Sequence, residues 1–140
     1  MNTMSIIVDD IYQRLKVFSN GVISGTVYKH KRLKDGNMED IVVQCAGNRT
    51  TKFQQFNYLF VRVYVPDLTI GKNTVANTGR FPILEQFLLD FSNVLHSCDS
   101  YVVDLSTRQI ETLQGEAYST QEATPFHMIV LTLQIKNLLK

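Results

Sequence analysis

The sequence predicts an α+β fold, a mostly antiparallel sheet of four to five strands with an N-terminal helix and a second helix packed on one face. Residues 6–18 and 81–95 each repeat apolar side chains at helical spacing. Residues 58–65 and 126–136 instead alternate with a period of two, as strands do. A chain of 140 residues with 44% hydrophobic and 19% charged residues suits one domain, residues 1–140, around a single core.

The first helix is expected over residues 6–18. Its apolar stripe consists of Ile7, Val8, Ile11, Leu15 and Phe18. Asn20-Gly21 is expected to end it, because glycine readily takes the left-handed backbone found at helix C-termini. Two strands joined as a hairpin are expected next, at residues 26–33 and 40–46, with Asp35-Gly36-Asn37 as the turn. Residues 47–51 are then expected to form a loop.

The stretch Tyr58–Val65 is expected to be the central strand, because it is rich in β-branched and aromatic residues and stops at a proline. Its alternation gives one apolar face, which belongs under a helix: Leu59, Val61, Val63 and Val65. The other face mixes aromatic and polar groups, so it is expected to meet a neighbouring subunit or a second layer: Tyr58, Phe60, Arg62 and Tyr64.

Residues 66–80 show no periodicity and are rich in glycine and asparagine, which predicts the longest loop of the chain, of the kind that serves a partner or a lid. The helix at 81–95 follows and is expected to lie across the face that carries Val61 and Val63. Residues 101–105 and 109–113 are expected to be extended, 115–124 turn-like, and 126–136 a second long strand paired with the central one.

The sequence offers weak candidates for catalysis. His96 and Cys98 lie two residues apart at a helix end, where side chains point away from each other. His30 and His127 are expected to be solvated or packed, because neither has a partner at ligand spacing. The carboxylate pairs of Asp99 with Asp104 and Glu111 with Glu116 fall in turn-like segments, where acids ordinarily face water. No enzyme activity, cofactor or small-molecule substrate is therefore predicted.

Cys45 and Cys98 lie far apart, without a CxxC pattern, so no zinc site is expected. Both are expected to be buried in a reducing compartment. No signal peptide and no membrane span are expected, because residues 1–10 carry acids and no apolar run reaches 18 residues.

The basic cluster at residues 29–34 raises the question of nucleic-acid binding. A strand would divide it, with Lys29 and Lys31 on one side and His30 and Arg32 on the other. Edge lysines also prevent unwanted strand pairing, and this explanation is preferred.

Residues 1–80 hold eleven basic against six acidic side chains, whereas residues 81–140 hold three against seven. This asymmetry would serve a head-to-tail ring, although two solvated faces explain it as well.

Three segments carry a resemblance to a known family: G-T-V-Y-K-H-K-R-L, M-E-D-I-V-V-Q-C-A-G-N and V-R-V-Y-V-P-D-L. Together with the element order, they resemble small proteins encoded among the head and tail genes of long-tailed bacteriophages and prophages, particularly of Bacteroides-type hosts. The order is similar to that of tail terminator and tail-completion proteins. The resemblance implies a structural virion protein, made in the host bacterial cytoplasm, of which six copies form a ring at the head-proximal end of the tail.

Under this resemblance the chain would end tail-tube polymerisation and join the tail to the neck. Its partners would be its own copies, the tail-tube protein and a neck or head-completion protein, with a passing contact to DNA in the lumen. The expected subunit interface comprises Tyr58, Phe60, Arg62, Tyr64, Lys29, Lys31 and Arg32, with residues 29–39 reaching across the joint. The expected tube or neck docking loop comprises Asp67, Thr69, Lys72, Asn73, Asn77 and Arg80. Two alternatives stay open: a head-completion or neck adaptor protein, and a cytosolic protein-binding adaptor module.

Overall fold

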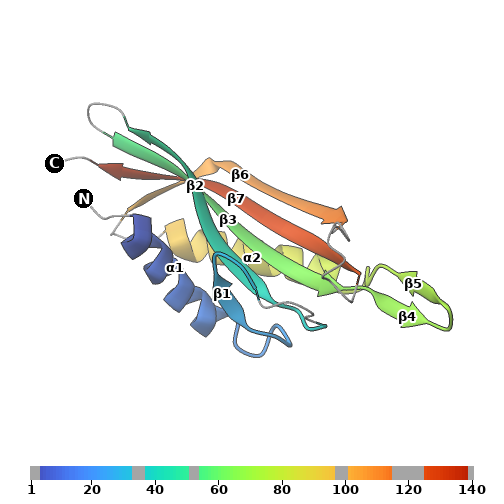
Figure 1. The fold of residues 1–140 in the computed structure, drawn as a ribbon. Helices are drawn as coiled ribbons and strands as arrows, with labels where there is room; N and C mark the ends of the chain where they lie inside the picture. The colour runs from blue at the N-terminus through green and yellow to red at the C-terminus, as the bar shows by residue number, and fades with distance from the viewer. Residues whose placement is uncertain (1–3, 33–36, 51–53, 97–100, 115–124, 139–140) are drawn as a thin grey trace.

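The computed structural model describes residues 4–32, 37–50, 54–96, 101–114 and 125–138. They form a five-stranded sheet with two helices on one face, and a separate two-stranded sheet (Figure 1). The elements in chain order are α1 (Met4–Phe18), β1 (Val27–Lys29), β2 (Ile41–Thr50), β3 (Gln54–Pro66), β4 (Leu68–Ile70), β5 (Asn73–Val75), α2 (Phe81–His96), β6 (Val102–Gln114) and β7 (Phe126–Leu138). The predicted α+β class with an N-terminal helix is confirmed.

Strand β3 is the centre of the larger sheet, whose order is β1-β2-β3-β7-β6. It pairs antiparallel with β7 from Gln54 opposite Leu138 to Pro66 opposite Phe126, without a register shift. It also pairs antiparallel with β2, and β6 pairs antiparallel with β7. The predicted pairing of the two long strands and the mostly antiparallel character of the sheet are confirmed.

The core lies between this sheet and the two helices. The core-facing side chains of β3 and β7 are all 0% exposed: Leu59, Val61, Val63, Val65, Ile129, Leu131, Leu133 and Ile135. Burial of each such side chain contributes about 1.5–3 kcal/mol. Helix α1 covers β1 and β2, and α2 covers β6 and β7, so β3 lies above the line between the helices. As expected, the second helix packs on the face of the sheet that carries Val61 and Val63, and Phe18 of α1 packs against Phe87 and Phe91 of α2 between the helices.

The predicted hairpin at residues 26–46 is wrong, since β1 pairs with β2 in parallel, with Val27 opposite Ile41. Strand β1 ends at Lys29 and is followed by His30, whose backbone is left-handed with φ 70°. The chain then returns to the start of β1, where the Thr26 amide donates to Asp40 Oδ1 at 2.9 Å. A Cβ on Gly25 would lie 2.1 Å from that carboxylate oxygen, so only glycine allows this approach. Side chain and backbone contacts, rather than turn residues, therefore set the parallel register.

Two predicted loops also contain strands. Strand β2 continues to Thr50 through a register shift between Ala46 and Arg49, where residues 47–51 were expected to leave the sheet. A β-bulge of this kind lets a strand continue past an unpaired residue. The segment 66–80 contains β4 and β5, described below. The expected break in the strand at 101–113 is a register shift between Asp104 and Gln109 within the single strand β6.

Several predicted features lie outside the described residues: residues 35 and 36 of the expected turn, the segment 115–124, and the residues Lys34, Cys98, Asp99 and Glu116. Neither α1 nor α2, the helices of the described part of the chain, has the length and apolar character needed to cross a membrane.

Candidate functional site

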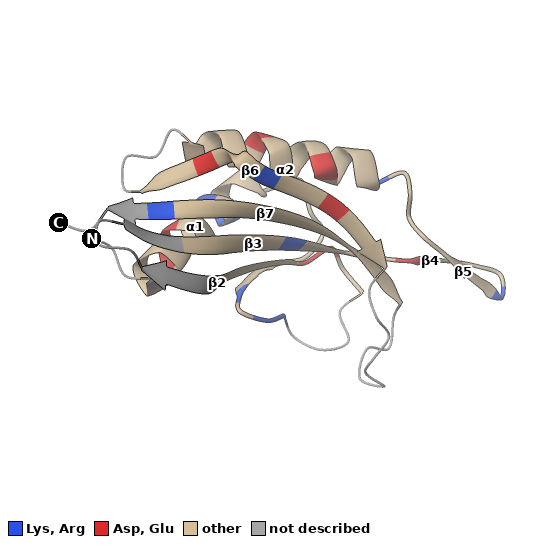
Figure 2. Ribbon diagram, turned by 90° about the horizontal axis from the view of Figure 1, so that it is seen from above, with Lys and Arg blue, Asp and Glu red and all other residues tan. Residues whose placement is uncertain are grey.

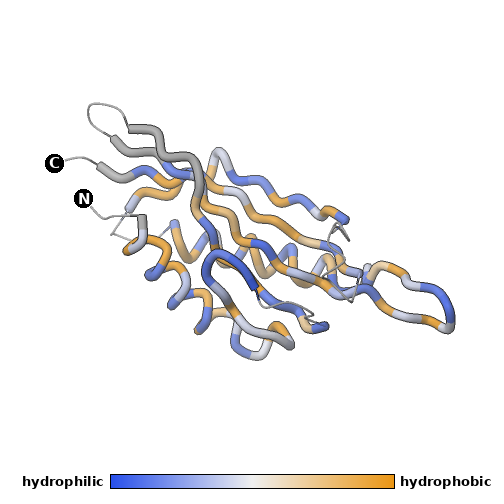
Figure 3. Tube along the Cα trace, viewed as in Figure 1, coloured by the Kyte–Doolittle hydropathy of each residue, from blue (hydrophilic) through white to orange (hydrophobic). Residues whose placement is uncertain are grey.

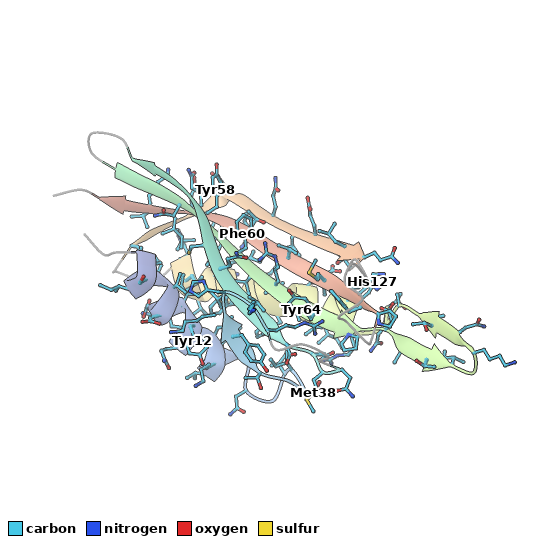
Figure 4. All side chains as sticks on the ribbon, viewed as in Figure 1. Tyr12, Met38, Tyr58, Phe60, Tyr64 and His127 are labelled. Carbon is cyan, nitrogen blue, oxygen red and sulfur yellow. The ribbon has the colours of Figure 1, made fainter. Side chains whose placement is uncertain are left out.

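The face of the sheet opposite the helices, here called the open face, is not covered by any described element (Figures 1 and 2). Tyr58, Phe60, Arg62 and Tyr64 of β3 lie on it, as expected from their alternation with the core residues (Figure 4). Tyr58 is 45% exposed, and the other three are half-buried. Neighbouring strands add further apolar side chains in register: Met128, Val130, Leu113 and Val102.

Polar groups on the open face are mostly held by one another. The Arg62 guanidinium donates to the Gln44 side chain and lies 5.2 Å from the Phe60 ring centroid. Lys136 lies 3.5 Å from Asp104, whose pKa is lowered, chiefly by hydrogen bonds from Ser106 and to a lesser extent by the lysine. The arrangement leaves aromatic and aliphatic groups exposed beside paired charges on this face.

One predicted interface residue, Arg32, is instead part of the interior. Its guanidinium carbon lies 4.0 Å from the Tyr64 ring centroid and 4.7 Å from that of Phe126. Its side chain is 4% exposed and lies 3.8 Å from the Asp40 carboxylate. Arg32 therefore closes one end of the open face within the chain, and an interface role for it stays a prediction.

The other members of the basic cluster point elsewhere. Lys29 binds Asp9 of α1 at 2.6 Å and lies 5.2 Å from the Tyr12 ring centroid. The hydrogen bond to Asp9 raises the pKa of Lys29. Lys31 and His30 are exposed. The described part of the cluster is thus divided between the α1 side, the solvent and the interior, and does not form one basic patch.

Strands β4 and β5 form a two-stranded hairpin, here called the arm, that projects past the end of the sheet (Figure 1). Gly71, with φ 62°, and Lys72 make its turn. The register places Leu68, Ile70 and Val75 on one face of the arm, and they are 44%, 63% and 40% exposed. Figure 3 shows apolar positions on both strands of the arm. The expected loop is therefore an ordered projection with an uncovered apolar face.

The root of the arm, formed by Asp67 before β4 and Arg80 after β5, is held to the body by a hydrogen bond and an ion pair. On the β4 side, Asp67 Oδ1 lies 2.6 Å from His127 Nδ1, and both side chains are less than one-fifth exposed. On the β5 side, Arg80 donates from Nε and Nη2 to the two carboxylate oxygens of Glu39, each at 2.7 Å, and from Nη2 to the Val22 carbonyl at 2.8 Å. The bond to Glu39 raises the pKa of Arg80. A bidentate pair fixes direction as well as position, so the arm leaves the body at a set angle.

These contacts divide the predicted docking residues into two groups. Asp67 and Arg80 anchor the arm within the chain, and their expected role in docking stays a prediction. Thr69, Lys72 and Asn73 are exposed on the arm and stay available to a partner. Asn77 is half-buried beside the root, where it lines an open cavity of about 530 Å³ together with Val22, Ile23, Asn37 and Arg80.

The catalytic candidates do not come together in the described residues. His96 is exposed, with its Nδ1 3.4 Å from the Val103 carbonyl, and Cys98 lies outside the described part. Cys45 is half-buried on the core side of β2, and burial raises the pKa of its thiol to about 11. Among the described residues, no three His, Cys, Asp or Glu side chains are placed to hold a metal ion.

The hairpin of the arm and the contacts of Asp67 and Arg80 at its root were not predicted from the sequence. The signal was present, because Leu68-Thr69-Ile70 and Asn73-Thr74-Val75 alternate on either side of Gly71-Lys72, a two-residue turn of the kind that closes hairpins.

The sequence matches no known protein-family model, and a search of curated proteins finds no match either.

Proposed function

We propose that this chain is a structural virion protein that forms a ring at the head-proximal end of a phage tail. In this role it ends polymerisation of the tail tube and connects the tail to the neck. The resemblance of three sequence segments to phage head and tail proteins supports the assignment. The observation that carries the assembly itself is the open face, because a half-apolar sheet face with exposed aromatic groups is a typical protein interface.

The arm supports the same proposal. An isolated two-stranded hairpin is marginally stable in water, yet this one is anchored by the Asp67–His127 hydrogen bond and the Arg80–Glu39 ion pair and presents apolar side chains to the outside. An arm that is fixed at its root and carries an exposed apolar face suits contact with another polypeptide. The open face and the arm are different surfaces, and contacts between different surfaces generate closed rings when the rotation closes.

The proposal predicts that the purified chain forms a ring, for which six copies are expected. Native mass measurement gives the copy number and negative-stain images give the shape. Mixing the chain with the tail-tube protein of the same genome should then shorten the tubes. A chain that stays monomeric at high concentration and leaves tube length unchanged would contradict the proposal. Binding to portal-side proteins instead of the tube would identify a head-completion or neck adaptor. The contact with lumen DNA stays a prediction.

A further inference from the structure

Among the described residues, no other element covers the apolar side chains of the arm or pairs with its backbone. Its apolar face is exposed at Leu68, Ile70 and Val75, and its strands pair only with each other among the described residues. The outer edge of each strand therefore presents unpaired peptide groups. Such an edge readily accepts or joins another strand. Because the arm extends beyond the ends of β3 and β7, it points away from its own sheet (Figure 1).

Strand β6 offers a matching edge. It is the last strand in the order β1-β2-β3-β7-β6, and within the described residues it pairs only with β7. Its first part is interrupted by the register shift between Asp104 and Gln109, whereas residues 109–114 continue in register. This second part contains no proline and no lysine, which are the residues that commonly block edge pairing.

The side chains of the two edges are complementary. Leu113 of β6 lies on the open face beside Met128 and is 44% exposed, so an added strand with an apolar face would continue the apolar surface. Lys72 is exposed at the turn of the arm, and Glu111 is exposed in the middle of the free edge. No ion pair is seen for either of them in the described part of the chain. The arm belongs to the basic half of the chain and β6 to the acidic half.

We propose that the arm of one copy adds to the edge of β6, at residues 109–114, in a second copy. Backbone hydrogen bonds would extend the five-stranded sheet, Lys72 would face Glu111, and the apolar face of the arm would lie beside Leu113. The arm and β6 are different surfaces, so every copy gives an arm and receives one. The inference rests on the proposed ring, for which it names the contact between neighbouring copies.

Crosslinking between two labelled variants tests this contact directly. One variant carries Asn73→Cys in the arm, the other carries Gln109→Cys in β6, and both have Cys45→Ser and Cys98→Ser. The two full-length chains carry tags of different size and are mixed before a flexible bismaleimide is added. We expect the mixed product, arm to β6, to dominate. Products that are only arm to arm or only β6 to β6, or no product between copies, would overturn the inference.

A charge exchange gives a second test that does not depend on crosslinker reach. Lys72→Glu and Glu111→Lys should each weaken self-association about three- to tenfold, and the double variant should regain most of the loss. Sedimentation measures the association. The control is Val17→Asp, a change on α1 at a position that is 79% exposed, which should leave association unchanged.

The outcomes separate the two proposals. If rings form but the single charge variants assemble normally and no mixed product appears, the arm contact is wrong while the ring stands. If the mixed product forms but the assembly is not a ring and leaves tube length unchanged, the arm contact stands and the proposed function is wrong. If the loss of association free energy in the double variant equals the sum of the losses in the two single variants, Lys72 and Glu111 do not face each other and the stated register is wrong.

Discussion

The two faces of β3 come from the same eight residues but differ in what completes them. The face with Leu59, Val61, Val63 and Val65 is completely buried by helices of its own chain. The face with Tyr58, Phe60, Arg62 and Tyr64 mixes aromatic and charged groups, no described helix or strand lies over it, and Arg32 packs over Tyr64 at one end. The comparison shows that one strand can present a fully buried aliphatic face and a partly exposed aromatic face, because both described helices lie on the same side of the sheet.

Truncation on the helix-covered face should have the largest effect. Leu131→Ala in β7 removes a side chain that is 0% exposed, so we expect the free energy of unfolding to fall by about 2–5 kcal/mol. Urea denaturation measures the loss. The matched control is Val130→Ala, one residue away on the open face, which should cost about 1 kcal/mol or less. Equal losses would mean that the open face is covered in solution by the chain itself.

Substitution on the open face should act on association rather than on folding. Tyr58→Asp places a charge among aromatic groups on a surface proposed to be an interface. We expect association to weaken by about 2 kcal/mol or more, roughly thirtyfold, while the denaturation midpoint changes little. Sedimentation equilibrium of the full chain, beside Val17→Asp as control, measures the first quantity. A loss of stability without a loss of association would assign Tyr58 to the fold alone.

Weakening the Arg80–Glu39 pair at the root should make the arm more mobile, with a smaller loss of stability than truncation in the core. Glu39→Gln removes the charge that accepts both bonds from Arg80, and a partly buried pair of this kind is worth about 1–3 kcal/mol. Amide hydrogen exchange of Ile70 and Asn73 should become faster, whereas exchange in β7 should change little. The comparison variant is Gln86→Ala, which loses an exposed hydrogen bond to Asp90 on α2 and should leave the arm unchanged.

The smallest effect concerns Cys45. Its pKa is raised by burial from 9.0 to about 11, so the folded chain holds this proton more tightly than the unfolded chain. The stability linked to it is therefore complete below pH 9 and is lost as pH rises from 9 towards 11. Alkylation of the folded chain should be slow at pH 8 and fast only near pH 11, as measured by mass. A half-maximal rate near pH 9 would show that the thiol is open to water.

The sequence predicted the elements whose pattern is carried by side chains along one segment. Both helices, β3, β7 and the interrupted β6 were identified because apolar spacing is a local property. The parallel pairing of β1 could not be found in this way, since it depends on Asp40 binding Thr26 and on the absence of a side chain at Gly25. Turn residues at 35–37 suggested a hairpin, and contacts from elsewhere in the chain decided otherwise.

The candidate site was predicted in part for the same reason. Alternation placed Tyr58, Phe60, Arg62 and Tyr64 on one face correctly, because strand geometry alone decides it. The burial of Arg32 over Tyr64 and the anchoring of Asp67 and Arg80 involve partners 32 or more positions away, and charged residues in loops are ordinarily solvated. The arm was not predicted, although its pattern is local, because strands of only three residues each are too short to show clear alternation.

The order of the strands also has a consequence for synthesis on the ribosome. Strand β7, the last along the chain, occupies the place between β3 and β6, and β6 has no other described neighbour. Until residues 126–138 leave the exit tunnel, β6 has nothing to pair with and the centre of the sheet is incomplete. The nascent chain is therefore expected to gain its native structure late and in one step, and fragments released before residue 126 should be removed by proteases.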